Sequence, residues 1–310
     1  MIRAVLDIGT NTVLMTIQDT GNNRILGDYS SIARLGEGLQ KTGKIGADAI
    51  GRLGKILTDY LKIMDKTGVS HCRLIATSAM RDASNRQEVI DQIQRDFGLT
   101  IEVISGDEEA QYTYSGGLTG LNPDPSKPIG LIDIGGGSTE YIIGTTESIR
   151  FKKSLNMGTV RYSEQFHLHS ENPESFDLDG LRQEIKRQLS QLQVTPPSDT
   201  QWVGVAGTPT SLSAAFHQLK KYEATVVHGS VLSLGWLESN AAEFSKLPPK
   251  GLLERYPIFG KRYDLILAGT IILTESLRWA GTDQLMVSDH GLRYGVLNAG
   301  EDQNWRERTV

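Results

Sequence analysis

Two short stretches decide the fold: Asp-Ile-Gly-Thr-Asn-Thr at residues 7–12 and Asp-Ile-Gly-Gly-Gly-Ser-Thr at residues 133–139. Each follows an apolar run typical of a strand and precedes a second such run, so each reads as strand, tight turn, strand. The two aspartates, Asp7 and Asp133, are 126 positions apart. One pattern therefore opens each half of the chain. It predicts two related α/β domains that face each other across a cleft.

The chain between the two stretches alternates between strand-like and helix-like patterns. The alternation predicts an α/β layer with a mixed sheet. We expect helices over 48–66, 85–97 and 108–118 and strands over 74–76 and 101–104.

Three prolines between residues 122 and 128 cannot continue a helix or a central strand. We therefore expect domain I over 1–125 and domain II over 126–310, with a C-terminal helix at about 298–310 packing back on domain I. In domain II we expect strands over 129–132, 141–143, 202–205 and 285–287, and helices over 211–219, over 262–279 and from residue 292.

Composition excludes several classes of protein. The 310 residues carry a formal net charge of −5, which argues against broad nucleic-acid binding. The single cysteine, Cys72, excludes an intrachain disulfide. The N-terminus lacks the pattern of a signal peptide, and no apolar run approaches the ~20 residues of a membrane span. We expect a cytoplasmic protein with no membrane partner.

Three turns rich in glycine, serine and threonine follow predicted strands, at 9–12, 135–139 and 207–210. Glycine lets backbone N–H groups converge on one point, and such turns and helix N-termini bind anions. The Gly-Lys-Ser/Thr phosphate loop and the dinucleotide fingerprint are both absent. The three turns therefore indicate phosphate handling and argue against a dehydrogenase.

Acidic residues lie beside two of these turns. Asp7 and Asp133 end strands and Glu140 begins a return strand, and such oxygens suit Mg²⁺. Farther along, Glu108 fits a capping box with Ser105, which leaves Glu109 available for another role.

Arg81 lies in a polar turn after a predicted strand. Two interpretations stay open for it: a bidentate grip on phosphate, or an ion pair with Asp82 or another nearby acid.

These stretches resemble the exopolyphosphatase and guanosine pentaphosphate phosphohydrolase family (Ppx/GppA). The resemblance extends over nearly the whole chain and is carried, in order, by DIGTNT (7–12), ATSAMRDASN (76–85), ISGDEEA (104–110), LIDIGGGSTEYI (131–142), NMGTVR (156–161), GVAGTPTSL (204–212) and VSDHGLRYGVL (287–297). It implies two actin-like domains (ribonuclease H-like, ASKHA superfamily) with the active site in the cleft between them.

The resemblance also implies roles. Glu109 matches the catalytic carboxylate, and Asp133 and Glu140 match the acids that hold Mg²⁺ (Mn²⁺ would suit the same oxygens) and position water; Asp7 is a further candidate acid. The positions that match phosphate contacts are Gly9, Thr10, Asn11, Thr12, Arg81, Gly135, Gly136, Gly137, Ser138, Thr139, Gly207 and Thr208.

We therefore expect a hydrolase that removes terminal phosphate from inorganic polyphosphate. Three alternatives stay open: hydrolysis of guanosine pentaphosphate, a kinase of the same superfamily, or a nucleotide-sensing scaffold. The chain resembles the short, two-domain form of the family, for which we expect lower processivity on long polyphosphate. Whether the protein forms a homodimer stays open. Tyr294 departs from the glutamate that the family often has, which puts in doubt any ion pair of that glutamate.

Overall fold

The computed structural model describes residues 1–299 and 305–307 and divides into two compact units. The first unit contains Met1–Gly116 and the segment from Leu292, and the second contains Gly117–Gly291. The division therefore falls before the proline-rich segment at which we placed the boundary. The segment from Leu292 belongs to the first unit. Most of the terminal helix expected at about 298–310 lies outside the described residues, and residues 306–307 form a short strand.

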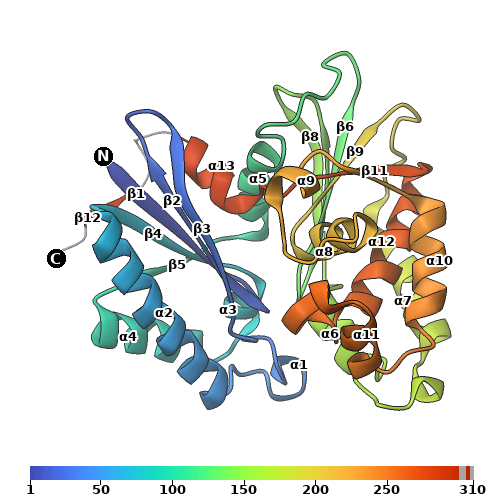
Figure 1. Cartoon of the computed structure of the whole chain (residues 1–310), viewed down its shortest axis with the longest axis horizontal. Helices are drawn as coiled ribbons and strands as arrows, with labels where there is room; N and C mark the ends of the chain where they lie inside the picture. Colours follow the sequence, from blue (N-terminus) through green and yellow to red (C-terminus); the bar gives the residue numbers. More distant parts are fainter. Residues whose placement is uncertain (300–304, 308–310) are drawn as a thin grey trace. The chain divides into compact units, whose positions relative to one another are not determined.

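The first unit is built on a six-stranded mixed sheet (Figure 1). Its strands are β1 (Ile2–Ile8), β2 (Thr12–Asp19), β3 (Arg24–Ile32), β4 (His71–Ala76), β5 (Ile101–Val103) and β12 (Arg306–Glu307). β1, β2 and β3 form an antiparallel meander, β4 runs parallel to β1, and β5 runs parallel to β4. Its helices are α1 (Leu39–Thr42), α2 (Ala47–Thr67), α3 (Ser78–Asp82), α4 (Arg86–Phe97), α5 (Gly106–Gly117) and α13 (Leu292–Asn298).

Successive side chains of β1 point to opposite faces of the sheet and are buried in two different hydrophobic cores. Leu6 and Ile8 are buried with residues of α2 and α4, whereas Val5 is buried with Leu292 and Val296 of α13. Because side chains two apart in a strand share a face, Asp7 lies on the face that α13 covers.

The second unit repeats this plan. Its strands are β6 (Ile129–Ile134), β7 (Thr139–Gly144), β8 (Ile149–Leu155), β9 (Gln201–Val205), β10 (Val231–Ser233) and β11 (Gln284–Val287). β6, β7 and β8 form an antiparallel meander, β9 runs parallel to β6, and β11 runs parallel to β9. The order β8-β7-β6-β9-β11 thus matches β3-β2-β1-β4-β5 of the first unit. The predicted fold class, α/β with two related units, is confirmed.

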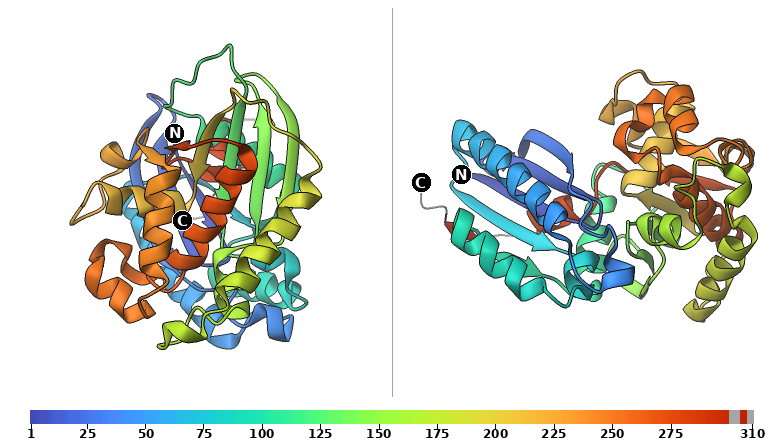
Figure 2. Two further views of the ribbon diagram at one scale, coloured as in Figure 1. Left: turned by 90° about the vertical axis from the view of Figure 1, so that its right-hand side faces the viewer. Right: turned by 90° about the horizontal axis from the view of Figure 1, so that it is seen from below.

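The helices of the second unit include α12, a hydrophobic helix most of whose residues are buried. They are α6 (Thr159–Gln165), α7 (Leu178–Leu189), α8 (Gly207–Phe216), α9 (Ala224–Val227), α10 (Leu234–Phe244), α11 (Pro249–Arg255) and α12 (Ile266–Ala280), with 3₁₀ turns η1 (Pro173–Ser175), η2 (Ser190–Leu192) and η3 (Pro257–Arg262). α12 lies between α7 and α10 (Figure 2), which explains why it is buried on nearly every side. No described helix is both long enough and apolar enough to span a membrane.

Candidate functional site

The two duplicated turns close in the same way. In the first, the Gly9 amide donates to the Thr12 carbonyl at 3.0 Å; in the second, the Gly135 amide donates to the Ser138 carbonyl at 3.0 Å. These pairs are again 126 positions apart. A Cβ at either glycine would lie 3.0–3.1 Å from that same carbonyl oxygen, a tight contact, so the turn geometry favours glycine.

Neighbouring segments hold both turns in place: a loop in the first unit and the start of α6 in the second. The Gly36 amide donates to the Thr10 carbonyl at 2.8 Å, and the Ala33 amide donates to the Asn11 carbonyl at 3.0 Å. In the second unit the Val160 amide donates to the Gly136 carbonyl at 2.9 Å, and Arg161 Nε donates to the Gly137 carbonyl at 3.0 Å. These hydrogen bonds fix the backbone of both turns from outside.

The third turn leads into α8, which begins at Gly207, four residues before the predicted start. Ala206 has φ 71° and ψ −165°, an uncommon conformation for a residue with a Cβ. The guanidinium of Arg262 lies against Gly207, where an added Cβ would be 2.6 Å from Arg262 Nη1. In the sequence, the pair Lys261–Arg262 fits either ordinary solvated surface or the lining of a groove for a polyanion, so the contact with Gly207 could not be predicted.

Arg81 and Glu109 meet in the first unit. Arg81, on α3, donates to Oε2 of Glu109, on α5, with Nη1 at 2.5 Å, and also to the Ile104 carbonyl at 3.2 Å. Of the two interpretations of Arg81, the ion pair is therefore present, but with Glu109 rather than with Asp82. The predicted catalytic carboxylate is 8% exposed, so the fold holds a nearly buried acid beside a guanidinium.

The predicted capping box beside Glu109 is present. The Ser105 amide donates to Glu108 Oε2 at 2.9 Å, and the Glu108 amide donates to Ser105 Oγ at 3.2 Å. The hydrogen bond from the Ser105 backbone holds the pKa of Glu108 below its usual value. Glu108 therefore serves the N-terminus of α5.

Asp133 and Glu140 are opposite each other on the antiparallel strands β6 and β7. Directly opposed residues project their side chains on the same face of a sheet. Glu140 is 1% exposed and accepts a 2.6 Å hydrogen bond from Ser154 Oγ on β8. The described residues contain no group of three or more His, Cys, Asp or Glu arranged to hold a metal. Mg²⁺ keeps several waters and is often held by one or two carboxylates, so this pair fits that ion.

Asp7 lies at the end of β1 and has an unusual environment. Its Oδ1 is buried and accepts no hydrogen bond within the described part of the chain, and the same is true of Asn11 Oδ1. Burial raises the pKa of Asp7 to about 6, and the positive charge of Arg293 partly opposes this.

Arg293 belongs to a buried polar cluster on α13 and the neighbouring meander. Its Nη1 donates to Thr16 Oγ1 at 2.7 Å and forms an ion pair with Asp28. Tyr294 Oη donates to Asp28 Oδ2 at 3.0 Å. A glutamate in place of Tyr294 would bring a second negative charge toward Asp28. Tyr294 instead donates a hydrogen bond to Asp28, so tyrosine is compatible with this acid where glutamate would repel it.

Comparisons with known proteins agree with the sequence resemblance. Residues 15–303 match the Ppx/GppA phosphatase family. Exopolyphosphatase 2 of Mycobacterium tuberculosis is 32% identical, with 94% of this chain and 96% of that protein covered. A bifunctional 3-dehydroquinate synthase/phosphatase of Fusobacterium nucleatum is also 32% identical over 96% of this chain, which spans 46% of that longer relative.

Solved structures show the same fold. A Ppx/GppA family member from Aquifex aeolicus is 31% identical, with a TM-score of 0.78 and 96% of each chain covered. An exopolyphosphatase from Cytophaga hutchinsonii is 27% identical, with a TM-score of 0.86 and the same coverage. The chain therefore belongs to the Ppx/GppA phosphatase family.

Proposed function

We propose that this chain is an exopolyphosphatase, a hydrolase that releases terminal phosphate from inorganic polyphosphate. The observation that carries the proposal is the Arg81–Glu109 pair, in which a nearly buried carboxylate contacts a guanidinium suited to phosphate. Such a pair combines a proton acceptor and a phosphate ligand in one place. Family membership and relatives named exopolyphosphatase support the substrate.

In the proposed reaction Glu109 accepts a proton from a water molecule whose oxygen attacks the terminal phosphorus. The bond from that phosphorus to the bridging oxygen breaks, and orthophosphate and a chain shortened by one unit leave. Arg81 contacts the phosphate oxygens, and the amides of the two duplicated turns and of the first turn of α8 bind phosphate groups. Phosphoryl transfer depends chiefly on positioning and charge stabilisation, which these groups supply.

We propose Mg²⁺ as the cofactor, held by Asp133 and Glu140, with Mn²⁺ as a substitute. When bound, such an ion neutralises negative charge on phosphate oxygens. The chain's own contribution is to hold the two carboxylates on one face of the sheet, with Ser154 orienting Glu140.

The test is phosphate release by the purified protein with Mg²⁺ from long-chain polyphosphate, short-chain polyphosphate and guanosine pentaphosphate. Release from polyphosphate supports the proposal, and the ratio across substrates measures preference. Release from guanosine pentaphosphate alone would replace the exopolyphosphatase proposal with the alternative activity, hydrolysis of guanosine pentaphosphate. Absence of release from all three would favour a kinase or a nucleotide-sensing scaffold, for which ATP consumption with an acceptor and nucleotide-dependent assembly are the next measurements.

A further inference from the structure

Arg73 is a buried arginine of the first unit whose contacts lead to α5, the helix that carries Glu109. It lies on β4, where Leu74 and Ala76 point into the core shared with α2 and α4. Because side chains alternate along a strand, Arg73 points to the opposite face, beside Val5 of β1. Only 4% of Arg73 is exposed. A buried guanidinium is costly unless polar or charged groups surround it, so its partners show which elements it joins.

Two partners from different elements surround this guanidinium. Arg73 Nη2 donates to both carboxylate oxygens of Glu102 on β5, at 2.9 and 2.8 Å. The guanidinium also lies over the ring of Tyr112 on α5, with Cζ 5.8 Å from the ring centroid, which is a cation–π contact. Arg73 therefore connects two neighbouring strands of the sheet to α5.

Tyr112 is also fixed from the side of α13. A Cβ at Gly295 would overlap the Tyr112 carbonyl oxygen and would lie 2.5 Å from the carbonyl carbon and 2.8 Å from Cα. All three are backbone atoms, so α13 packs directly on the backbone of α5 at this residue. Tyr112 is thus held through its ring by Arg73 and through its backbone by α13.

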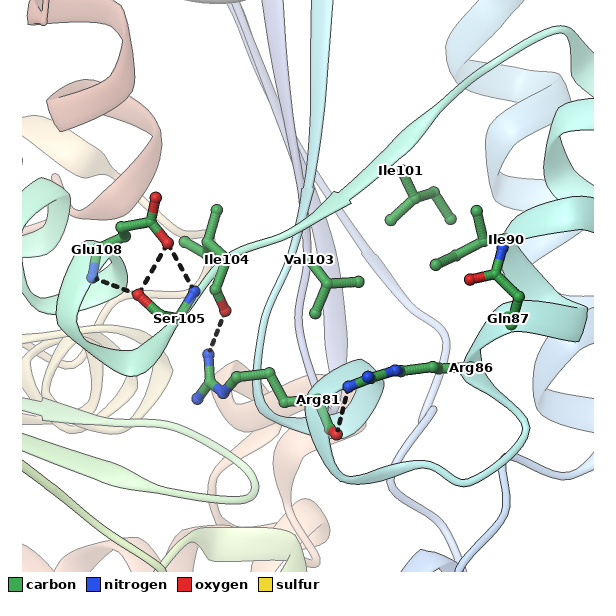
Figure 3. A pocket seen from close by; sticks show the side chains of 9 residues that line it. All are labelled: Arg81, Arg86, Gln87, Ile90, Ile101, Val103, Ile104, Ser105 and Glu108. Atoms are coloured by element: carbon green, nitrogen blue, oxygen red, sulfur yellow. Dashed lines mark hydrogen bonds between the residues drawn. The ribbon is translucent and has the colours of Figure 1, made fainter.

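The first turn of α5 borders open space on one side. A pocket of about 490 Å³ lies there, and Arg81, Ile104, Ser105 and Glu108 are among its lining residues (Figure 3). Figure 3 shows the hydrogen bonds that hold this turn: the capping box of Ser105 and Glu108, and the bond from Arg81 to the Ile104 carbonyl. Because the space beside the turn leaves it room to move, its position depends on contacts farther along the helix.

Glu109 and Tyr112 are three residues apart, so they are neighbours on the surface of α5. A change in the rotation or depth of the helix at Tyr112 therefore moves the Glu109 carboxylate relative to Arg81, which it contacts at 2.5 Å. We infer that Arg73 is a positioning residue for Glu109 and acts through Tyr112. The inference rests on the proposed function, because it deepens the assignment of Glu109 as the group that accepts a proton from water.

The test is whether the effect of Arg73 on the rate requires Glu109. Phosphate release from short-chain polyphosphate is measured for the wild type, Arg73→Met, Glu109→Gln and the double variant. A misplacement of about 1 Å can cost about 10²-fold in rate, so Arg73→Met should lower kcat by about 10–100-fold and change KM by less than about twofold. In the Glu109→Gln background the same change should lower the remaining kcat by less than about twofold, because the group that Arg73 positions is absent.

Conservative and matched variants separate positioning from a loss of stability. Tyr112→Phe keeps the ring over Arg73 and should keep most of the wild-type kcat, whereas Tyr112→Leu should reproduce the loss seen in Arg73→Met. The matched control is Arg3→Met: Arg3 lies two residues before Val5 on the same sheet face, is 6% exposed and has its Cζ 4.6 Å from the Trp305 ring centroid. It should lower the free energy of unfolding but keep kcat. Urea denaturation identifies any variant that does not fold, and Tyr112→Leu carries the test if Arg73→Met is one of them.

Three kinetic results would overturn the inference. The first is wild-type kcat in both Arg73→Met and Tyr112→Leu. The second is an equal fold loss on replacing Arg73 in the wild-type and Glu109→Gln backgrounds, since the effect would then not pass through Glu109. The third is an equal loss of kcat in Arg3→Met.

A second readout does not depend on turnover. The coupling between Arg81 and Glu109 is measured by urea denaturation of Arg81→Met, Glu109→Gln and their double variant. Repeated in the Arg73→Met background, this coupling should fall by at least about half, and an unchanged coupling would overturn the inference. If the chain releases no phosphate from polyphosphate, or if Glu109→Gln keeps the wild-type kcat, the proposed role of Glu109 fails, while the coupling still decides whether Arg73 positions its carboxylate.

Discussion

Arg81 Nη1 lies 2.5 Å from Glu109 Oε2, although the two residues are 28 positions apart in the sequence. The contact joins α3, at the carboxyl end of β4, to the first turn of α5, after β5. Because β4 and β5 are parallel neighbours, their carboxyl ends meet at one edge of the sheet. The duplicated turn between β1 and β2 also follows the carboxyl end of a strand parallel to β4. Open α/β sheets bind ligands at this edge.

Replacing Glu109 by glutamine should abolish most of the activity while leaving binding. Glutamine keeps the size and one oxygen for Arg81, but it cannot accept a proton. General base catalysis is typically worth about 10²–10⁴ in rate, so kcat for polyphosphate should fall by that factor. The measurement is steady-state phosphate release together with equilibrium binding of short-chain polyphosphate. The assignment of Glu109 does not survive if the variant retains wild-type kcat.

Replacing Arg81 by methionine should reduce both stability and activity. It leaves the carboxylate of Glu109 nearly buried without its guanidinium, and breaking a buried pair in this way costs about 3 kcal/mol. In the double variant Arg81→Met/Glu109→Gln the unpaired charge is gone, so the free energy of unfolding should recover while activity stays low. Urea denaturation measures the free energy of unfolding of the single and the double variant, and phosphate release measures their activity. Equal stability of the single and double variants would contradict a coupled pair.

Removal of Mg²⁺ by EDTA should stop phosphate release, and Asp133→Asn or Glu140→Gln should weaken Mg²⁺ binding strongly. Ser154→Ala gives a finer test, because Ser154 touches Glu140 rather than the ion. Loss of such a partner typically lowers metal affinity about 10–100-fold. Calorimetric titration with Mg²⁺ is the measurement, and Ser239→Ala, an exposed position on α10, is the control. Unchanged Mg²⁺ affinity in all three site variants would place the ion elsewhere.

The sequence predicts the duplicated units because each turn is formed by residues that are close together in the sequence. Asp7 and Asp133 each end a strand, and the glycines two residues later close identical hydrogen bonds. The capping box of Glu108 is predicted for the same reason, since all its atoms lie within four residues.

Other features depend on distant parts of the chain and could not be predicted. β3 and β8 were missed because each is the third strand of a meander and carries many exposed or half-exposed side chains, so neither forms an apolar run. The pairing of Arg81 with Glu109 needs the parallel register of β4 and β5. The return of α13 to the first unit likewise depends on its packing against Val5 and Ile75, which lie more than 200 residues earlier.

The raised pKa of Asp7 predicts that the free energy of unfolding depends on pH. Its pKa is about 6 in the folded protein and 3.8 as an unperturbed group. Since the folded value is raised, the folded state binds the proton more tightly, and this contribution is complete below pH 3.8 and lost as the pH rises through 6. The free energy of unfolding should therefore fall by up to about 3 kcal/mol between these values.

Asp7→Asn removes that titration, so its stability relative to the wild type should increase from pH 4 to pH 7. Urea denaturation at several pH values gives the difference directly. Asp48→Asn, at an exposed position in the first turn of α2, is the control for loss of an aspartate charge. Parallel profiles of Asp7→Asn and the wild type would show that Asp7 titrates normally.

Gly158→Ala tests whether the second duplicated turn depends on close packing of its neighbour. A Cβ at Gly158 would lie 2.4 Å from the Gly136 oxygen and 2.5 Å from the Gly137 nitrogen, both backbone atoms, so the turn itself must shift. Overpacking of this kind typically costs about 1–3 kcal/mol. Because the displaced amides are the proposed phosphate ligands, KM for polyphosphate should rise together with the loss of stability. Gly235→Ala, on α10 with no atom within 4 Å of the added Cβ, should instead be neutral or stabilise by up to about 1 kcal/mol. If Gly158→Ala lowers stability but leaves KM unchanged, the turn is a structural element only, and phosphate is bound by other groups.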